Sequence, residues 1–195
     1  MVRMPQRPKR LVVVIDGTNL KIALNRRSLS TWVNYRELAV EVARRVPRES
    51  GIEPWSLESV TYVTAAPIQS HDPERHSRWR RFEAMLRRTE RVRLLLGRLE
   101  GPPGRVYEKG VDILVAVELL RGAYRDEYDA AILVAGDGDY ADVARAVSEA
   151  GKFIANAFFA DARSYALAQA SQAFVDLNRI PWDRIRLRPQ HRRPR

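Results

Sequence analysis

The fold class is decided by residues 10–19, which read RLVVVIDGTN. The apolar run at 11–15 has the length of a β-strand and is far shorter than the roughly 20 residues of a membrane-spanning helix. A second run, AAILVA at 130–135, is followed by GDGD at 136–139. Uninterrupted apolar runs of this length are typical of parallel strands that helices cover on both faces. The two runs therefore predict strands of a buried parallel sheet.

Extended and helical segments alternate along the rest of the chain. Further strands are predicted at 57–66, 92–99, 152–159 and 174–178. Helices are predicted at 20–27, 34–46, 73–88, 110–123, 139–150 and 164–172. Alternation of this kind indicates βαβ units. We therefore expect a three-layer α/β/α sandwich around a mostly parallel central sheet of about five to six strands.

Length and composition favour one domain with basic ends. A domain usually has about 100–200 residues, and the chain has 195. We assign residues 1–9 to a short basic N-terminal segment and residues 10–178 to the domain. Residues 179–195 are rich in arginine. We expect them to form a flexible basic tail whose beginning is docked by Trp182.

The balance of charge indicates a polyanionic partner. The formal net charge is +10, from 34 Lys and Arg against 24 Asp and Glu. Such an excess favours nucleic acid or an anionic membrane surface, and we expect nucleic acid and no membrane, because no apolar stretch is long enough to span one. The chain has no cysteine, which excludes disulfides, thiolate zinc sites and cysteine nucleophiles. A cysteine-free chain fits the reducing cytoplasm, where we expect the protein to act.

Acidic residues stand where the predicted sheet would present a ligand. Four aspartates are candidate site residues, namely Asp16, Asp112, Asp137 and Asp139. Ligands of open α/β sheets bind beyond the carboxyl ends of the strands, and carboxylates gathered there repel one another unless a cation or shared protons relieve them. Mg²⁺ and Mn²⁺ are hard ions that prefer oxygen ligands. The plainer interpretations are a turn for Asp16, a helix N-cap for Asp139 and a favourable helix-dipole position for Asp112.

Two groups of basic residues are candidates for binding phosphate. Lys109 stands just before Asp112, and a lysine beside a carboxylate cluster can hold a scissile phosphate or offset the charge of the cluster. Otherwise Lys109 is an exposed residue ahead of a helix. The predicted helix at 73–88 carries six arginines around Trp79. Aromatic rings can stack on bases, but Trp79 shares a helix face with Phe82, so we expect it to pack in the core.

Three motifs occur in order and together resemble the NYN-domain family, the LabA-like branch of the PIN-like nucleases. They are VIDGTN at 14–19, KGVD at 109–112 and AGDGDY at 135–140. The resemblance continues to Ser164, Leu167 and Phe174, so it covers residues 10–178. One position departs from the family, whose members often carry an aspartate shortly before the late aromatic residue, where this chain has Ser171.

The resemblance implies a PIN-like fold and a ribonuclease that depends on Mg²⁺ or Mn²⁺. It implies a supporting role for Asn19 at the first motif. The implied metal-binding acids are Asp16, Asp112, Asp137 and Asp139. Such carboxylates would hold one or two ions, and hydrolysis would leave a 5′-phosphate and a 3′-hydroxyl. RNA is the expected partner, while DNA, a second copy of the chain and a partner protein remain open.

Other classes of protein fit the sequence less well. A nucleic-acid-binding or regulatory module without catalysis would explain the basic charge, but binding a polyanion gains nothing from clustered carboxylates. A haloacid-dehalogenase-like phosphatase is suggested by IDGT at 15–18, but its nucleophilic aspartate would stand where this chain has Val14. A dinucleotide-binding oxidoreductase needs a Gly-x-Gly-x-x-Gly turn, and none follows the first predicted strand. The binding module is therefore the main alternative.

Overall fold

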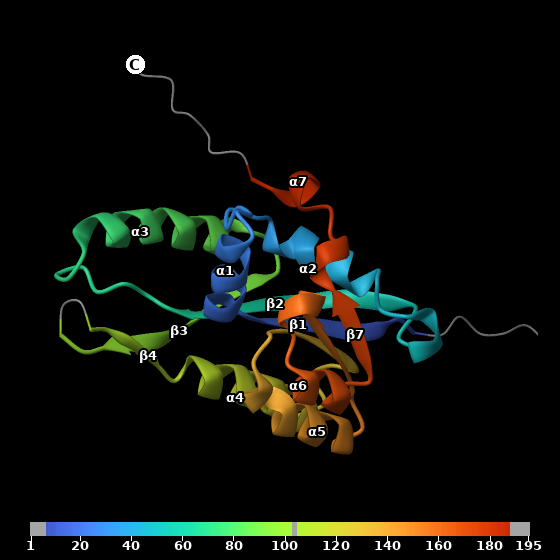
Figure 1. Cartoon of the computed structure of the whole chain (residues 1–195). Coiled ribbons are helices and arrows are strands. Elements are labelled where there is room, and N and C mark those ends of the chain that lie inside the picture. The colour runs from blue at the N-terminus through green and yellow to red at the C-terminus, as the bar shows by residue number, and fades with distance from the viewer. Residues whose placement is uncertain (1–6, 103–104, 188–195) are drawn as a thin grey trace, which may run out of the picture.

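The computed structural model describes residues 7–102 and 105–187. In this part of the chain, seven strands form one sheet in the order β4-β3-β2-β1-β5-β6-β7 (Figure 1). The strands are β1 (Lys9–Asp16), β2 (Trp55–Ala65), β3 (Val92–Glu100), β4 (Tyr107–Lys109), β5 (Ala130–Val134), β6 (Phe153–Phe158) and β7 (Ala173–Asp176). Neighbouring strands are parallel except at one edge, where β4 runs antiparallel to β3. The predicted mostly parallel sheet is confirmed.

The sheet has seven strands rather than the five to six that we predicted. The strand that sequence reasoning missed is β4, which has three residues, YEK, all exposed. Its position is set by pairing with β3, where Glu100 lies opposite Tyr107 and Arg98 lies opposite Lys109. A short polar strand that depends on its partner carries no apolar pattern of its own, so periodicity could not reveal it.

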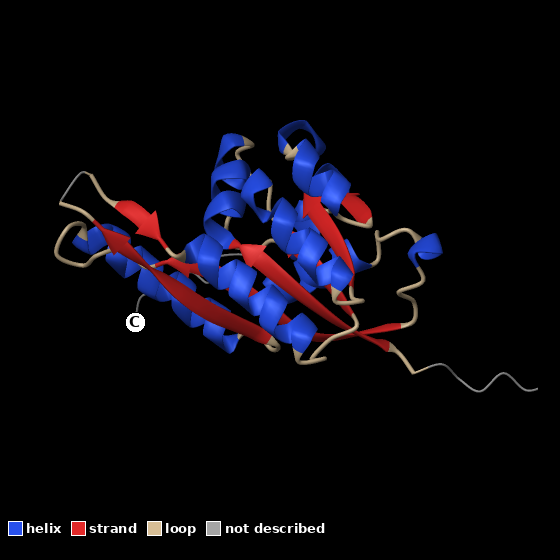
Figure 2. Ribbon diagram, turned by 90° about the horizontal axis from the view of Figure 1, so that it is seen from below, coloured by secondary structure: helices blue, strands red, loops and turns tan. Residues whose placement is uncertain are grey.

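Helices cover both faces of the sheet, which confirms the three-layer α/β/α sandwich (Figures 1 and 2). One layer contains α1 (Gly17–Arg26), α2 (Tyr35–Ala43), α3 (Pro73–Arg88) and α7 (Trp182–Ile185). The opposite layer contains α4 (Val111–Tyr124), α5 (Ala141–Glu149) and α6 (Tyr165–Ala170). Short 3₁₀ turns complete the described chain: η1 (Arg48–Ser50), η2 (Gly138–Tyr140), η3 (Ala160–Ala162) and η4 (Leu177–Arg179). No helix in the described residues has the length and apolar character needed to cross a bilayer.

Strand β1 shows why its apolar run is uninterrupted. Leu11, Val13 and Ile15 pack in the core beneath α1 and α2. Val12 and Val14, which point the other way, pack in the core beneath α4 and α5. Because both faces of the strand are covered here, every position from 11 to 15 is apolar. The polar residues of β1 stand at its two ends, with Lys9 and Arg10 before the apolar run and Asp16 after it.

The strand order reverses beside the end of β1. From β1 the chain builds the sheet outward through β2 and β3 to β4, and then returns to place β5 on the other side of β1. Ligands of α/β sheets bind outside the carboxyl ends of the strands where the strand order reverses in this way. Asp16 ends β1 and Asp137 follows β5, so both stand at this point.

The ordered fold extends beyond residue 178, where we had predicted that a flexible tail begins. Trp182, the expected docking residue, stacks on Phe159 with ring centroids 5.9 Å apart, and its indole N–H donates to the carbonyl of Leu177 at 3.0 Å. Ile180 and Ile185 are buried. Residues 179–187 are therefore part of the fold, and the rest of the predicted tail lies outside the described residues, as do residues 1–6 of the predicted N-terminal segment.

Candidate active site

Asp16 is the most buried of the candidate acids, with 7% of its surface exposed. It is the N-cap of α1, because its Oδ1 accepts the backbone N–H of Asn19 at 2.9 Å. Its Oδ2 accepts the hydroxyl of Tyr140 at 2.8 Å. The cap starts α1 at Gly17, three residues before the predicted start at Leu20. One carboxylate therefore joins the end of β1, the start of α1 and the segment after β5.

Gly17 fixes the backbone next to this carboxylate. A Cβ atom at Gly17 would lie 2.2 Å from Cε1 of Tyr62, a distance that no side chain tolerates. The Tyr62 hydroxyl donates to the Gly17 carbonyl at 3.1 Å. Glycine is needed here for close approach to a buried ring, and that contact leaves Asp16 little freedom to move.

Two side-chain amides hold the peptide bond between Ala135 and Gly136, one residue before Asp137. The N–H of Gly136 donates to Oδ1 of Asn19 at 2.8 Å, and Nδ2 of Asn156 donates to the carbonyl of Ala135 at 2.8 Å. Asn19 thus links the first motif to the third, a structural role consistent with the supporting role expected for it. Asn156 was missed by sequence reasoning, although a fully buried asparagine inside the strand FIANAF is a signal in itself.

Asp137 and Asp139 exchange the roles suggested by the sequence. Asp137 caps the turn η2, since its Oδ1 accepts the N–H of Asp139 at 3.1 Å. Asp139 lies inside that turn, and the N-cap of α5 is Tyr140, so Asp139 is not the helix cap. Both aspartates are exposed to solvent. The structure therefore leaves the Asp139 carboxylate without the capping function that was its plainer interpretation.

Asp112 and Lys109 occupy different surroundings. Asp112 is exposed in the first turn of α4, and its charge, with that of Asp137, contributes to a raised pKa of Tyr140. Burial is the largest cause of that increase and the Asp16 charge is the next. Lys109 instead pairs with Glu100 at 3.2 Å across the β3–β4 hairpin. The structure thus brings Asp112 near the other acids but directs the Lys109 ammonium to a different partner.

The surroundings of Asp16 disfavour the ionised form of its carboxyl group. Burial raises its pKa above the ordinary value, and the charge of Asp137 raises it further, while the hydrogen bonds from Asn19 and Tyr140 lower it. Desolvation and like charge both disfavour the ionised form. Carboxylates with perturbed pKa values in a crevice are typical of functional sites.

Glu108 is an acidic residue of this region that sequence reasoning passed over. Its Oε1 accepts the hydroxyl of Thr18 at 2.8 Å. Partial desolvation raises the pKa of Glu108, and the Asp16 charge raises it again. The signal in the sequence was its position beside Lys109, but only the pairing of β4 with β3 brings it to the end of β1.

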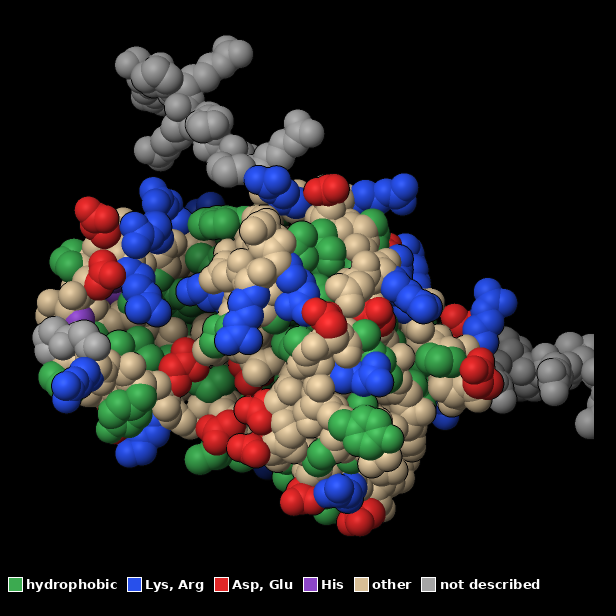
Figure 3. Space-filling model, viewed as in Figure 1, with side chains coloured by type: hydrophobic (Ala, Val, Ile, Leu, Met, Phe, Trp, Pro, Cys, Tyr) green, Lys and Arg blue, Asp and Glu red, His purple; other side chains and the backbone are tan. Residues whose placement is uncertain are grey.

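The donor set suits a hard divalent cation, because all of its groups are carboxylates. Figure 3 shows acidic side chains gathered in the hollowed middle of the molecular face, with lysine and arginine side chains around them. As the side chains stand, no three Asp, Glu or His groups within the described residues lie close enough to hold one ion. Asp16 is fixed, whereas Asp112 and Asp137 are exposed, so an ion would have to draw these two side chains inward.

The rival phosphatase chemistry has no nucleophile at this site. Position 14 is valine, and Val14 is buried in the core beneath α4 and α5. An aspartyl-phosphate intermediate cannot form on a valine. The crevice at the end of β1 is therefore a cluster of carboxylates without the aspartate that a haloacid-dehalogenase-like enzyme requires.

Comparison with known proteins identifies the family. No curated protein matches the chain in sequence. Among solved structures, a protein of unknown function from Vibrio parahaemolyticus shares the fold, with a TM-score of 0.65 and 17% identity over 89% of this chain and 96% of that one. A putative oxidoreductase from Parabacteroides merdae aligns with a TM-score of only 0.32 and 14% identity, over 87% of this chain and 31% of that one. The model of the NYN domain, a family of the PIN-like nuclease superfamily, matches residues 10–178, and the chain belongs to this family.

Proposed function

We propose that the protein is a metal-dependent ribonuclease of the LabA-like branch that hydrolyses RNA phosphodiester bonds in the cytoplasm. The observation that carries the proposal is the buried Asp16 carboxylate at the point where the strand order reverses. Burial and the charge of Asp137 both raise its pKa and so disfavour its ionised form. A binding protein for a polyanion would gain nothing from such a cluster. The chain belongs to a nuclease superfamily, in which clustered carboxylates can serve as ligands of a catalytic metal ion.

Four carboxylates are assigned as the metal ligands in this proposal, namely Asp16, Asp112, Asp137 and Asp139. Mg²⁺ or Mn²⁺ at such a site supplies Lewis-acid stabilisation of the phosphodiester and a more acidic water. The chain itself holds Asp16 in one orientation through Asn19 and Tyr140. Because the Tyr140 hydroxyl donates to Oδ2, it favours the ionised, electron-donating form of that carboxylate.

Lys109 is assigned a phosphate contact that it does not make in the present conformation. Its ion pair with Glu100 is exposed, and exposed pairs contribute at most about 1 kcal/mol. A phosphate bound at the end of β1 could therefore displace Glu100 from the Lys109 ammonium at little cost. In-line addition of water to phosphorus would break the bond to the 3′ oxygen and leave a 5′-phosphate and a 3′-hydroxyl.

An RNA-binding or regulatory module without catalysis is the second candidate. It is favoured by one observation, which is that no three acidic side chains of the described residues converge as placed. The net charge of +10 is compatible with both candidates. The two are separated by whether RNA is cut and not by whether it is bound.

The test is a cleavage assay on end-labelled single-stranded RNA, structured RNA and DNA, with Mg²⁺, Mn²⁺ or EDTA. The proposal requires cleavage of RNA with a divalent ion and its loss in Asp137→Asn. Asp183→Asn is the matched control, since Asp183 is an exposed aspartate on α7, in the opposite helix layer from α4 and α5. Cleavage that persists in Asp137→Asn, or RNA binding without cleavage under every ion, would overturn the proposal.

A further inference from the structure

A cleft of about 460 Å³ opens next to the acidic cluster, between α1 and α3. The two helices lie in the same layer (Figure 1). Tyr62 and Thr64, near the end of β2, also line the cleft. Its volume lies in the range of about 300–1,000 Å³ that is usual for ligand sites. Thr18 and Glu108, which neighbour Asp16, line one end. The cleft is therefore continuous with the candidate active site and distinct from it in composition.

Aromatic rings form one wall of this cleft. Trp32, Tyr62 and Trp79 each contact the ring of Phe82, with centroid distances of 5.9, 5.7 and 5.8 Å. Trp32 and Trp79 are only half-buried. The prediction that Trp79 packs in the core is thus met on one side of the ring only, since Trp79 also lines the cleft. A half-exposed indole is a surface on which an unpaired base can stack.

Positive charge is concentrated on both helices beside these rings. Lys21 on α1 and Arg75, Arg78 and Arg81 on α3 all line the cleft. Among the described residues, only Arg78 of these four has an acidic partner within an ion-pair distance, Glu74 at 3.6 Å. The pKa of Lys21 is lowered by partial burial and by the charge of Arg75. Glu108 also lines the cleft, and its charge partly offsets those of Lys21 and Arg75. Four cations against one carboxylate leave positive charge in excess, and a phosphate group would pair with it.

The two sites are joined by one hydrogen bond. Thr18 follows Asp16 by two residues and donates to Glu108 at the rim of the cleft. A strand that places a base against Trp79 and its phosphate against Arg75 would therefore meet the acidic cluster with a neighbouring phosphate. A paired base cannot enter such a cleft, because its faces are covered by stacking and its edge by its partner.

We propose that the cleft between α1 and α3 binds one unpaired nucleotide of an RNA strand, with its base on Trp79 and Trp32 and its phosphate on Arg75 and Lys21. The inference rests on the proposed ribonuclease function and names its substrate class as single-stranded RNA. The cleft selects the strand that the acidic cluster cuts.

The test measures binding separately from cleavage. The anisotropy of a fluorescein-labelled ten-nucleotide RNA is followed in EDTA, as a single strand and annealed to its complement. Wild type binds the single strand more tightly than the duplex, and Trp79→Ala and Arg75→Ala each weaken single-strand binding by about fivefold or more. Trp79→Phe keeps an aromatic ring and restores most of the affinity. An unlabelled mononucleotide competes only at much higher nucleotide concentration than the strand.

Matched controls come from the same elements. Arg88→Ala changes an exposed arginine at the other end of α3, and Trp55→Ala changes a half-buried tryptophan at the start of β2. Both bind the single strand like wild type. The inference is overturned if Trp79→Ala binds like wild type, if the duplex binds as tightly as the single strand, or if Trp79→Phe binds as weakly as Trp79→Ala while both remain folded. It is also overturned if a free mononucleotide binds as tightly as the strand.

Failure of this inference is distinguishable from failure of the proposed function. If Asp137→Asn abolishes cleavage but Trp79→Ala and Arg75→Ala leave binding unchanged, the ribonuclease stands and the cleft assignment falls. If no RNA is cut under any ion but single-strand binding depends on Trp79, the cleft stands and the ribonuclease falls.

Discussion

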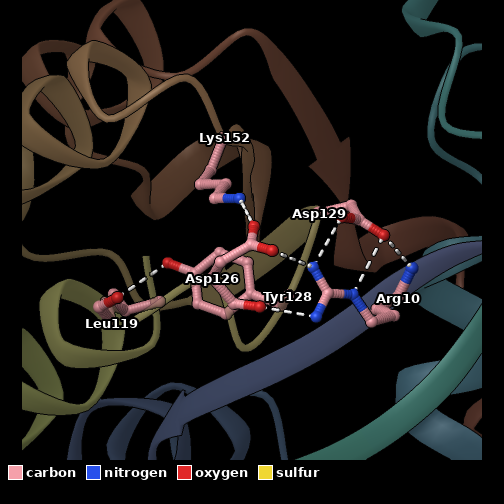
Figure 4. Close-up of polar contacts among 6 residues, drawn as sticks. All are labelled: Arg10, Leu119, Asp126, Tyr128, Asp129 and Lys152. Carbon is pink, nitrogen blue, oxygen red and sulfur yellow. Dashed lines mark hydrogen bonds and ion pairs between the residues drawn. The ribbon is translucent and has the colours of Figure 1, made fainter. Parts of the chain in front are cut away.

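Carboxylates lie at both ends of β1, but those at the amino end are paired with cationic side chains and Asp16 at the carboxyl end is not. At the amino end, Arg10 donates from its backbone N–H to Asp129 at 2.8 Å and from its guanidinium to the same carboxylate at 2.9 Å (Figure 4). Lys152 pairs with Asp126, which also lies 3.2 Å from the Arg10 guanidinium. At the carboxyl end, Asp16 has hydrogen-bond donors but no cationic side chain bonded to it within the described residues.

The pKa values follow this difference. The hydrogen bond from Arg10 lowers the pKa of Asp129 to about 2, and Lys152 lowers that of Asp126. Burial and the Asp137 charge raise the pKa of Asp16. Both ends belong to the same strand of the same basic protein, so overall charge does not explain the contrast. At one end the chain supplies its own cations, and at the other the balancing charge has to come from outside.

The largest effect is expected for Asp16→Asn. The amide keeps an acceptor for the Asn19 N–H and a group that pairs with the Tyr140 hydroxyl, but it removes the charge. We expect RNA cleavage to fall by about 100-fold or more, because a metal site loses a ligand. The rate of cleavage with Mn²⁺ in excess is the measurement, with Asp183→Asn beside it. A cleavage rate within about threefold of wild type would show that the Asp16 charge is not needed for cleavage, and the proposed difference between the two ends of β1 would then be wrong.

A smaller effect, on folding, is expected for Gly17→Ala. The added methyl group would meet the buried ring of Tyr62, and overpacking of this kind costs about 1–3 kcal/mol. Urea unfolding measures the loss. Tyr62→Phe serves as the comparison, since it removes the hydrogen bond to the Gly17 carbonyl and keeps the ring. An unchanged urea midpoint in Gly17→Ala would mean that Asp16 is not held as rigidly as the structure indicates.

At the amino end, Arg10→Ala is expected to lower stability by about 1–2 kcal/mol at neutral pH, because two carboxylates lose their partner. The Asp129 pKa is lowered in the folded state, so its stabilising contribution is present above about pH 4 and is lost as the pH falls toward 2. Urea midpoints at pH 5 and pH 2.5 should therefore differ less in Arg10→Ala than in wild type. An equal difference in the two proteins would contradict the assignment.

The smallest effect is expected for Lys152→Met, which keeps the apolar stem of the side chain and removes its charge. Lys152 is largely buried but Asp126 is largely exposed, so solvent screens the attraction between them. The change in free energy of unfolding should therefore be smaller than that of Arg10→Ala. A loss equal to that of Arg10→Ala would show that the amino-end cluster acts as one unit.

Local sequence determined much of the fold and only part of the site. The runs at 11–15 and 130–135 revealed β1, β5 and the aspartates that follow them, because buried parallel strands have a pattern of their own. The strand β4 has no such pattern, and with it the positions of Glu108 and Lys109 were lost. Asn156 acts through a peptide bond on the neighbouring strand, a contact that no spacing along the chain encodes.

The most direct test of the account is the thermal unfolding midpoint at pH 7 with and without Mn²⁺. Because the pKa of Asp16 is raised in the folded state, the folded state loses stability as the pH rises past the ordinary pKa of an aspartate. The ionised carboxylate therefore destabilises the folded state unless a cation is bound beside it. An ion at 100 times its dissociation constant adds about 2.7 kcal/mol, or several degrees for a chain of this size.

Wild type and Asp183→Asn should gain these degrees, whereas Asp16→Asn should be at least as stable as wild type without Mn²⁺ and gain little from it. An equal gain in Asp16→Asn, or none in wild type, would contradict a cation site at the carboxyl end of β1.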